Sequence, residues 1–279
     1  MSEGAARAPS RGPLVESAWL AVHGNDDGVR IVDMRWYLDG RSGRRAYEAG
    51  HIPDAVYVDL EAITGQGPGR HPLPEAGRFQ AEMRRAGVGD STLVVAYDDA
   101  SGSVAARLWW LLGLFGHPRA GVLDGGIQAW PGPLSTEEAT PPPGDMTAVA
   151  PDRDRYFDYE EVSALGAEAV LLDARAPERF RGEVEPVDPR AGHIPGARSA
   201  FWGDNTGPQG LFLTAARLRA RFRALGVREG PEAVVYCGSG VNACHDLLAL
   251  ELAGLHGARL YAGSWSDWSS RAQAPVATG

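Results

Sequence analysis

The residues best suited to chemistry are the consecutive positions Cys237, Gly238, Ser239, Gly240, Val241 and Asn242. The apolar run before them predicts a strand, and the pattern from Ala243 to Leu255 predicts a helix, so the thiol lies in a tight loop between the two. The glycines allow successive N–H groups to turn inward, and the following helix adds its positive end. Because such groups stabilise a thiolate, the loop predicts a nucleophilic cysteine.

A structural alternative exists for the same cysteine. A cysteine that closes a strand often serves only as a small core residue. The position of Cys237 at the first residue of a loop that continues Gly-Ser-Gly favours the nucleophile, and the core alternative stays open at this point.

Composition limits the class of protein. The 279 residues are 44% hydrophobic and 23% charged, as in soluble globular proteins, and suffice for two domains. The net charge of -9 argues against nucleic acid or an anionic membrane as the main partner. No segment reaches the roughly 18 apolar residues of a membrane span. With only two cysteines, Cys237 and Cys244, we expect a reduced, cytoplasmic protein without a disulfide framework or a metal site.

The chain contains an internal repeat. Residues 31–35, 51–55, 94–98 and 124–130 are echoed in the same order by residues 171–175, 193–197, 234–237 and 262–268, at offsets between 138 and 142. Four such pairs indicate a duplicated domain. We therefore predict a disordered tail over residues 1–13, a first domain over 14–134, a proline-rich linker over 135–154 and a second domain over 155–279.

Each copy alternates short apolar runs with helical patterns, which predicts an α/β fold with a mainly parallel sheet flanked by helices. Ligands of such sheets bind at the carboxyl ends of strands, the position predicted for Cys237. Its counterpart in the first copy is Asp98, a residue type that usually caps a helix. We expect the first copy to keep the fold and to lack the nucleophile.

These motifs resemble the two-domain (tandem) rhodanese-like sulfurtransferases over about residues 14–273. The marks are the repeated Asp-x-Arg and His-Ile-Pro segments, the paired Asp-Gly-Gly and Gly-Ser-Trp segments, and a single active cysteine in the second copy. The loop Cys-Gly-Ser-Gly-Val is similar to the 3-mercaptopyruvate sulfurtransferase branch, whereas the thiosulfate branch carries basic residues after the cysteine. Asn242 stands where the first branch has threonine, which leaves donor preference open.

The resemblance implies a two-step reaction in which Cys237 takes a sulfane sulfur from 3-mercaptopyruvate, or from thiosulfate, and becomes a persulfide. The sulfur then passes to a thiol, such as thioredoxin or glutathione, or to cyanide. No metal or organic cofactor is implied. The N–H groups of the loop, Gly238 to Asn242, would hold the negative persulfide.

The resemblance also assigns residues that bind the donor. Arg179 matches the carboxylate-binding arginine, and arginine is the natural partner of a carboxylate. Arg190 lies in the segment of the second such arginine, but it could equally match a structural arginine before the His-Ile-Pro turn. Trp36 matches a tryptophan that lines the cleft, with a core aromatic as the alternative. Arg181 is expected to be a solvated charge.

A proton relay is the further implication. His71 matches a histidine that aligns with the loop serine, Ser239, and Glu61 falls where the branch has aspartate, with Asp59 as the fallback carboxylate. Such a line could deliver a proton to the leaving enolate, which suits a group titrating near neutrality. The alternative for His71 is an exposed surface histidine.

Other residues are expected to be structural. His51 and His193 occur in both copies, including the one without the nucleophile, so they are expected to maintain the fold. Arg175 is expected to pair with buried carboxylates, and Cys244 to pack in the core.

Three functional alternatives accompany the mercaptopyruvate hypothesis. A cysteine phosphatase is largely excluded because its Cys-x5-Arg loop needs an arginine where this chain has Ala243. A thiosulfate-preferring rhodanese and a persulfide carrier module that serves a partner protein both stay open.

Overall fold

The computed structural model describes residues 12–279, so the predicted tail lies almost wholly outside the described residues. The chain divides into two compact units. The second unit comprises Thr64–Leu73, Asp152–Gly207 and Phe212–Gly279, and the first holds the described residues up to Ile63 together with Pro74–Pro151 and Pro208–Leu211. The boundaries predicted from the sequence remain a prediction. Two short segments therefore belong to the unit that is formed mainly by the other half of the sequence: Thr64–Leu73 to the second unit and Pro208–Leu211 to the first.

The first unit is built on a parallel five-stranded sheet of order β1-β5-β4-β2-β3. Every residue of β4 is buried, as expected for a strand covered on both faces. Its strands are β1 (Leu14–Val15), β2 (Val29–Asp33), β3 (Val56–Tyr57), β4 (Leu93–Tyr97) and β5 (Ala120–Leu123), and its helices are α1 (Ser17–His23), α2 (Gly43–Ala49), α3 (Ala76–Arg85) and α4 (Ala105–Leu114). Short 3-10 helices occupy η1 (Leu60–Ile63) and η2 (Gly126–Ala129).

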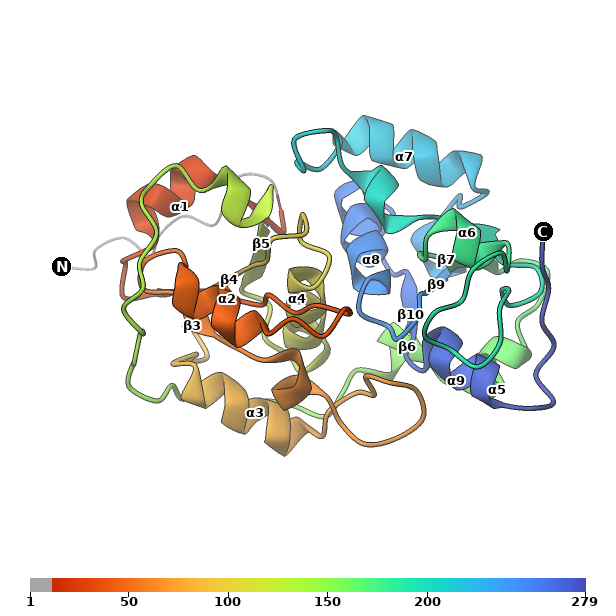
Figure 1. The fold of residues 1–279 in the computed structure, drawn as a ribbon, viewed down its shortest axis with the longest axis horizontal. Coiled ribbons are helices and arrows are strands. Elements are labelled where there is room, and N and C mark those ends of the chain that lie inside the picture. The colour runs from red at the N-terminus through yellow and green to blue at the C-terminus, as the bar shows by residue number, and fades with distance from the viewer. Residues whose placement is uncertain (1–11) are drawn as a thin grey trace. The chain divides into compact units, whose positions relative to one another are not determined.

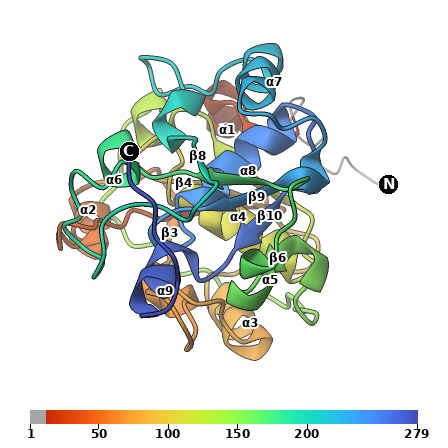
Figure 2. The same cartoon turned by 90° about the vertical axis from the view of Figure 1, so that its right-hand side faces the viewer.

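The second unit repeats this arrangement with the order β6-β10-β9-β7-β8. Helices α7 and α8 lie on one side of this sheet and α5 and α9 on the other (Figures 1 and 2). The strands are β6 (Tyr156–Phe157), β7 (Val170–Asp173), β8 (Arg198–Ser199), β9 (Ala233–Tyr236) and β10 (Arg259–Tyr261). The helices are α5 (Tyr159–Ser163), α6 (Pro177–Phe180), α7 (Ala215–Ala224), α8 (Ala243–Leu252) and α9 (Ser264–Ser270), with 3-10 turns η3 (Arg153–Arg155), η4 (Trp202–Asn205) and η5 (Gly230–Glu232).

The registers of the two sheets confirm the predicted α/β duplication. In the first unit Asp33 at the end of β2 pairs with Tyr97 at the end of β4. In the second unit Asp173 pairs with Tyr236 in the same way. The residue after each of these tyrosines is therefore equivalent in the two sheets, and those residues are Asp98 and Cys237.

A buried ion pair lies at the end of β2 in the first sheet and at the end of β7 in the second. Arg175 Nη2 lies 2.6 Å from the Asp173 carboxylate and donates to the carbonyl of Gly192 at 2.6 Å. Arg35 repeats both contacts with Asp33 and Gly50 in the first unit. Since removing one partner of a buried pair leaves an uncompensated charge, these pairs fix the strand ends. The structural role predicted for Arg175 is confirmed.

The two histidines of the His-Ile-Pro turns also take equivalent places. His51 stacks on Tyr47 with ring centroids 3.8 Å apart, and His193 stacks on Phe180 at the same separation. Each Nδ1 lies 2.8 Å from the main-chain carbonyl of the residue beneath it. These equivalent contacts agree with the predicted role of both histidines in maintaining the fold, which remains a prediction. Within residues 12–279, no helix is both long and apolar enough to cross a membrane.

Helix α8, which follows the cysteine loop, carries a fully buried carboxylate. Asp246 Oδ1 accepts a hydrogen bond from Asn205 Nδ2 at 2.6 Å and lies 4.0 Å from Arg221. Burial raises the pKa of Asp246 from its ordinary value to about 7. The folded protein therefore binds a proton at Asp246 more tightly than the unfolded chain does.

We expect Asp246→Asn to remove a pH dependence of stability. Because the folded pKa is raised, the stabilisation is present at pH 4 and is lost as the pH rises through about 7. The free energy of unfolding of the wild type, relative to that of the variant, should fall by at most about 4 kcal/mol between pH 4 and pH 8. Denaturant unfolding of both proteins across this range measures it. The exposed Asp204, near the same arginine, supplies the control Asp204→Asn, and parallel curves for wild type and Asp246→Asn would contradict the expectation.

Candidate active site

Cys237 lies directly after β9, as predicted, and its side chain is buried. The N–H of Gly240 donates to its Sγ at 3.1 Å. Gly240 has a φ of +82°, a left-handed conformation that favours glycine. One predicted donor of the persulfide cradle therefore already points at the sulfur, and the roles of the other cradle residues, Gly238, Ser239, Val241 and Asn242, remain predictions.

The start of α9 holds this loop in place. The N–H groups of Trp265 and Ser266 donate to the carbonyls of Cys237 and Gly238, both at 2.9 Å. These donors belong to the first turn of the helix, which has no intrahelical partners for them. The loop thus caps α9 while α9 fixes the loop. Cys244 is buried, as predicted, and its thiol donates to the Gly240 carbonyl at 3.3 Å.

His71 and Ser239 form a buried hydrogen-bonded pair. The His71 Nδ1 and the Ser239 Oγ lie 2.7 Å apart. His71 is only 4% exposed and Ser239 only 8%. His71 reaches this place because the segment Thr64–Leu73 packs with the second unit. The sequence analysis predicted that His71 aligns with Ser239, and the hydrogen bond between them agrees with this. Their catalytic role is still a prediction.

The two candidate carboxylates and the candidate aromatic lie in the first unit. Glu61 is exposed in η1, and its N–H donates to the Asp59 side chain at 3.0 Å. Trp36 is half-buried, three residues beyond the end of β2. Their predicted parts in the relay and in donor binding remain predictions.

Arg179 lies in the last turn of α6 and binds two buried carboxylates. Its Nη2 lies 2.6 Å from Glu185 and 3.0 Å from Asp188. Glu185 also binds Arg175 at 3.2 Å, so the donor-binding candidate is tied to the buried pair at the end of β7. A Cβ placed on Gly238 would lie 3.5 Å from Arg179 Nη1, which puts this guanidinium beside the cysteine loop.

A second arginine at the loop was not anticipated from the sequence. Arg70 Nη2 would lie only 2.7 Å from a Cβ on Gly238, and Arg70 Nη1 pairs with the Asp188 carboxylate. The only signal in the sequence was that Arg70 directly precedes His71. Its approach to the loop depends on how the segment Thr64–Leu73 folds, which spacing does not reveal.

Arg190 forms hydrogen bonds with the main chain. Its guanidinium donates to four carbonyls, those of Trp268, Ser269, Arg271 and Ala274, at 2.8 to 3.0 Å. These contacts match the structural alternative, and binding of donor by Arg190 stays an untested prediction. Arg181 forms an exposed pair with Glu183, as expected for a solvated charge.

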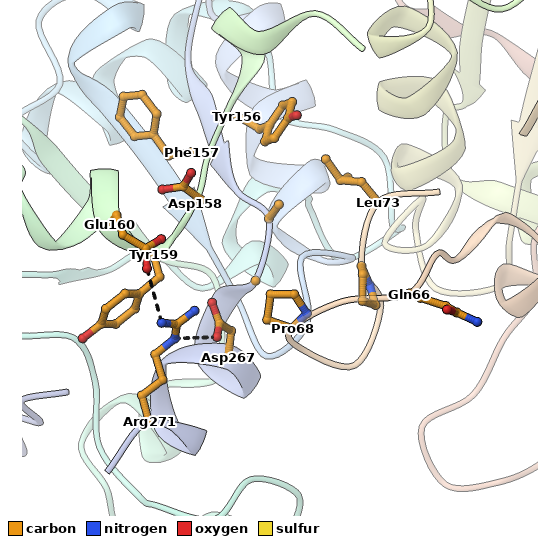
Figure 3. Close-up of a pocket in the computed structure, with 13 residues that line it drawn as sticks. Gln66, Pro68, Leu73, Tyr156, Phe157, Asp158, Tyr159, Glu160, Asp267 and Arg271 are labelled. Atoms are coloured by element: carbon orange, nitrogen blue, oxygen red, sulfur yellow. Dashed lines mark hydrogen bonds and ion pairs between the residues drawn. The ribbon is translucent and has the colours of Figure 1, made fainter. Parts of the chain in front are cut away.

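The segment Thr64–Leu73 also forms one wall of a pocket of about 260 Å³ within the second unit. Figure 3 shows Pro68 and Leu73 on one side and Tyr159 and Arg271 on the other. Arg271 is held by Asp267 at 2.8 Å and lies over the Tyr159 ring. The same segment therefore carries His71 and Arg70 toward the loop and shapes this partly aromatic hollow.

The equivalent loop of the first unit is filled by its own carboxylate. Asp98 accepts N–H groups from Ala100, Gly102, Val104 and Ala105 at 2.7 to 2.9 Å. It is almost fully buried; burial raises its pKa, and the four donors act in the opposite direction. The loop after the central strand is thus an anion cradle in this unit. Among residues 12–279, no group of three or more His, Cys, Asp or Glu is placed to hold a metal ion.

Comparison with known proteins gives a consistent result. Residues 16–132 and 159–271 each match the Rhodanese-like domain. A Pseudomonas aeruginosa protein named probable 3-mercaptopyruvate sulfurtransferase is 45% identical, over 97% of this chain and 99% of that protein. A Mycobacterium tuberculosis protein named putative thiosulfate sulfurtransferase SseB is 42% identical, over 91% and 92% respectively. The crystal structure of SseA from Escherichia coli, a 3-mercaptopyruvate sulfotransferase, is similar with a TM-score of 0.80 at 33% identity, covering 91% of this chain and 99% of that one.

We expect Asp98→Asn to destabilise the first unit more than its small chemical change suggests. An amide has one acceptor oxygen and places N–H groups against the N–H donors of the loop, so buried donors lose their partners. With each orphaned donor costing about 1–3 kcal/mol, a loss of several kcal/mol is expected in denaturant unfolding. The neighbouring Asp99, which accepts the Tyr37 hydroxyl at 2.6 Å, supplies the control Asp99→Asn. Equal losses in the two variants would contradict the cradle.

Proposed function

Because the chain belongs to the rhodanese-like family, with one copy of that domain in each half, we propose that it is a sulfurtransferase that carries sulfur as a persulfide of Cys237. The observation that carries the proposal is the thiol at the carboxyl end of β9 with the Gly240 N–H donated to its sulfur. The equivalent position of the first copy holds Asp98, so only the second copy is catalytic.

In the first step the Cys237 thiolate attacks the sulfur of 3-mercaptopyruvate. An S–S bond forms, the donor C–S bond breaks, and its electron pair leaves on carbon as the enolate of pyruvate. The hydrogen of the donor thiol is transferred to that enolate, which gives pyruvate and a persulfide anion on Cys237. Ser239 and His71 lie in hydrogen-bond contact and can relay this proton. Glu61 is proposed as the carboxylate of the relay.

In the second step an acceptor attacks the outer sulfur and releases the Cys237 thiolate. A thiol acceptor becomes a persulfide, and cyanide becomes thiocyanate. Loop N–H groups stabilise the negative sulfur throughout, with Gly240 as the donor already aligned. Thioredoxin or glutathione are the proposed acceptors, in a cytoplasm that keeps the two buried cysteines reduced.

Thiosulfate is the second candidate donor, and the name of the Mycobacterium tuberculosis relative favours it. In that reaction the S–S bond of thiosulfate breaks and sulfite leaves with the electron pair. The neutral residues after Cys237 favour instead a donor held by its carboxylate, which supports mercaptopyruvate. A carrier module would load one sulfur and release it only to a specific partner.

Mass spectrometry of the intact protein tests the proposal. After exposure to mercaptopyruvate, the wild type should gain the mass of one sulfur on Cys237 and lose it on addition of thioredoxin or cyanide. Cys237→Ser should gain none, because the nucleophile is absent. Cys244→Ser, which keeps a donor for the Gly240 carbonyl, should still load. Sulfur transfer by Cys237→Ser would overturn the mechanism, and a single release without turnover would favour the carrier.

The relay makes the two donors respond differently to mutation. Ser239→Ala and His71→Asn should lower kcat with mercaptopyruvate about 100-fold, because the enolate needs a proton as it leaves. Turnover of thiosulfate should change only a few-fold, since sulfite leaves without one. The exposed His256, paired with Glu251, gives the control His256→Asn. An equal loss with both donors would assign the pair to loop structure rather than proton transfer.

A further inference from the structure

The pocket that Thr64–Leu73 shapes in the second unit contains a single arginine, Arg271, in a lining that is otherwise aromatic, apolar or acidic. We propose that this pocket binds a small carboxylate with an aromatic or branched apolar body, and that Arg271 pairs with the carboxylate group. None of the described residues proposed for sulfur transfer lines the pocket, so this is a second ligand site.

Arg271 directly follows α9 and is oriented from two sides. Its Nε donates to Asp267 Oδ1, one helical turn earlier, at 2.8 Å. Its guanidinium lies 3.8 Å from the centre of the Tyr159 ring, and that ring packs against Trp268 with centroids 5.0 Å apart. Figure 3 shows the guanidinium between Tyr159 and Asp267 at one wall of the pocket. The arginine is therefore fixed in place through Nε and its flat face.

The outer nitrogens of Arg271 keep donors that a ligand can use. Among the described residues, Nη1 and Nη2 form no hydrogen bond, and the Glu160 carboxylate lies 3.5 Å from Nη1, longer than an ordinary N–H···O bond. The Glu160 side chain is 74% exposed, and such surface pairs contribute little stability. A loosely held carboxylate thus already lies beside the fork, which indicates the chemistry that this place accepts.

The other two carboxylates of the lining have closer partners. Asp267 is hydrogen-bonded to Arg271 itself, and Asp158 accepts a hydrogen bond from Arg153 at 2.9 Å. Within residues 12–279, Glu160 is therefore the one lining carboxylate without a hydrogen bond. A ligand carboxylate that displaces Glu160 into water exchanges a weak ion pair for a forked, charge-assisted one.

The opposite wall of the pocket suits an apolar body. Pro68, Pro72 and Leu73 line it, and Tyr156 contributes from β6. The volume of about 260 Å³ exceeds the roughly 150 Å³ of a cavity that admits benzene. One substituted ring therefore fits between this wall and Arg271. The rings of Tyr156 and Tyr159 already carry arginine guanidinium groups on a face, which argues against a cationic ligand.

Calorimetric titration of three probes into the whole chain tests the site: phenylacetate, its neutral amide phenylacetamide, and the cation benzylamine. Phenylacetate should bind at one site, and the amide and the amine at least about 10-fold more weakly, because only the carboxylate forms charged hydrogen bonds with Arg271. Arg271→Gln should weaken phenylacetate at least about 10-fold. Glu160→Gln should strengthen it about 2- to 5-fold, because the competing carboxylate is gone.

Matched controls separate the pocket from general charge effects. The exposed Arg181 and Glu168, which do not line the pocket, supply Arg181→Gln and Glu168→Gln, and both should bind phenylacetate within twofold of wild type. Leu73→Ala should weaken binding several-fold through lost apolar contact. No titration contains a sulfur donor, so the result does not depend on whether the chain transfers sulfur.

Hydrogen exchange provides a structural readout of the same site. The Gly65 N–H donates to the Pro72 carbonyl at 2.9 Å, and a ligand against Pro72 should slow exchange of this amide in the wild type. If Arg271→Gln fails to fold, Glu160→Gln still decides, because its side chain is exposed and its effect has the opposite sign. Equal binding of the amide or the amine, an unchanged constant in Glu160→Gln, or a loss in Arg179→Gln that Arg271→Gln does not show would overturn the proposal.

Discussion

A chain of alternating charges connects the interior of the second sheet to the cysteine loop, and the geometry of the site depends on it. Asp173 binds Arg175, Arg175 and Arg179 share Glu185, and Arg179 shares Asp188 with Arg70. Its members range from fully buried at the strand end to 28% side-chain exposure at Arg70. Removing one partner of a buried ion pair costs the protein about 3–5 kcal/mol of stability. The whole series of ion pairs therefore resists rearrangement. The position of a solvent-accessible guanidinium is thereby fixed by the core of the sheet.

The two units place different acceptors in the loop after the central strand. Both present backbone N–H groups after the central strand, and an unfilled set of buried donors would be costly. The first unit fills its cradle permanently with the Asp98 carboxylate, which accepts four of these groups. The second places Cys237 there, whose sulfur accepts the N–H of Gly240. The duplicated fold therefore presents the same loop twice, with an aspartate in the first copy and a cysteine in the second.

Much of this arrangement could be predicted from the sequence because it is local or repeated. The strand before Cys237, the helix after it and the equivalence with Asp98 follow from apolar runs and constant offsets. The observed elements confirm the strand and the helix, and the registers confirm the equivalence. The pairing of Ser239 with His71 came from family resemblance, since 168 residues separate them. Arg70 was missed because neither periodicity nor spacing reveals that Thr64–Leu73 packs with the second unit. Arg190 could not be decided either, because its four carbonyl partners are main-chain atoms without a sequence signature.

The neutral loop gives these distant arginines their importance. Gly238 and Ser239 bring no charge next to the sulfur, and the positive charge that lies near the loop comes from side chains of other segments. Asn242, which departs from the branch pattern, makes no side-chain cap for α8, and it brings no charge either. Gly238 instead leaves room for two guanidinium groups at the residue after the nucleophile. In the part of the chain that the structure describes, the ion-pair chain therefore places positive charge beside the cysteine loop, whereas the residue at 242 adds none.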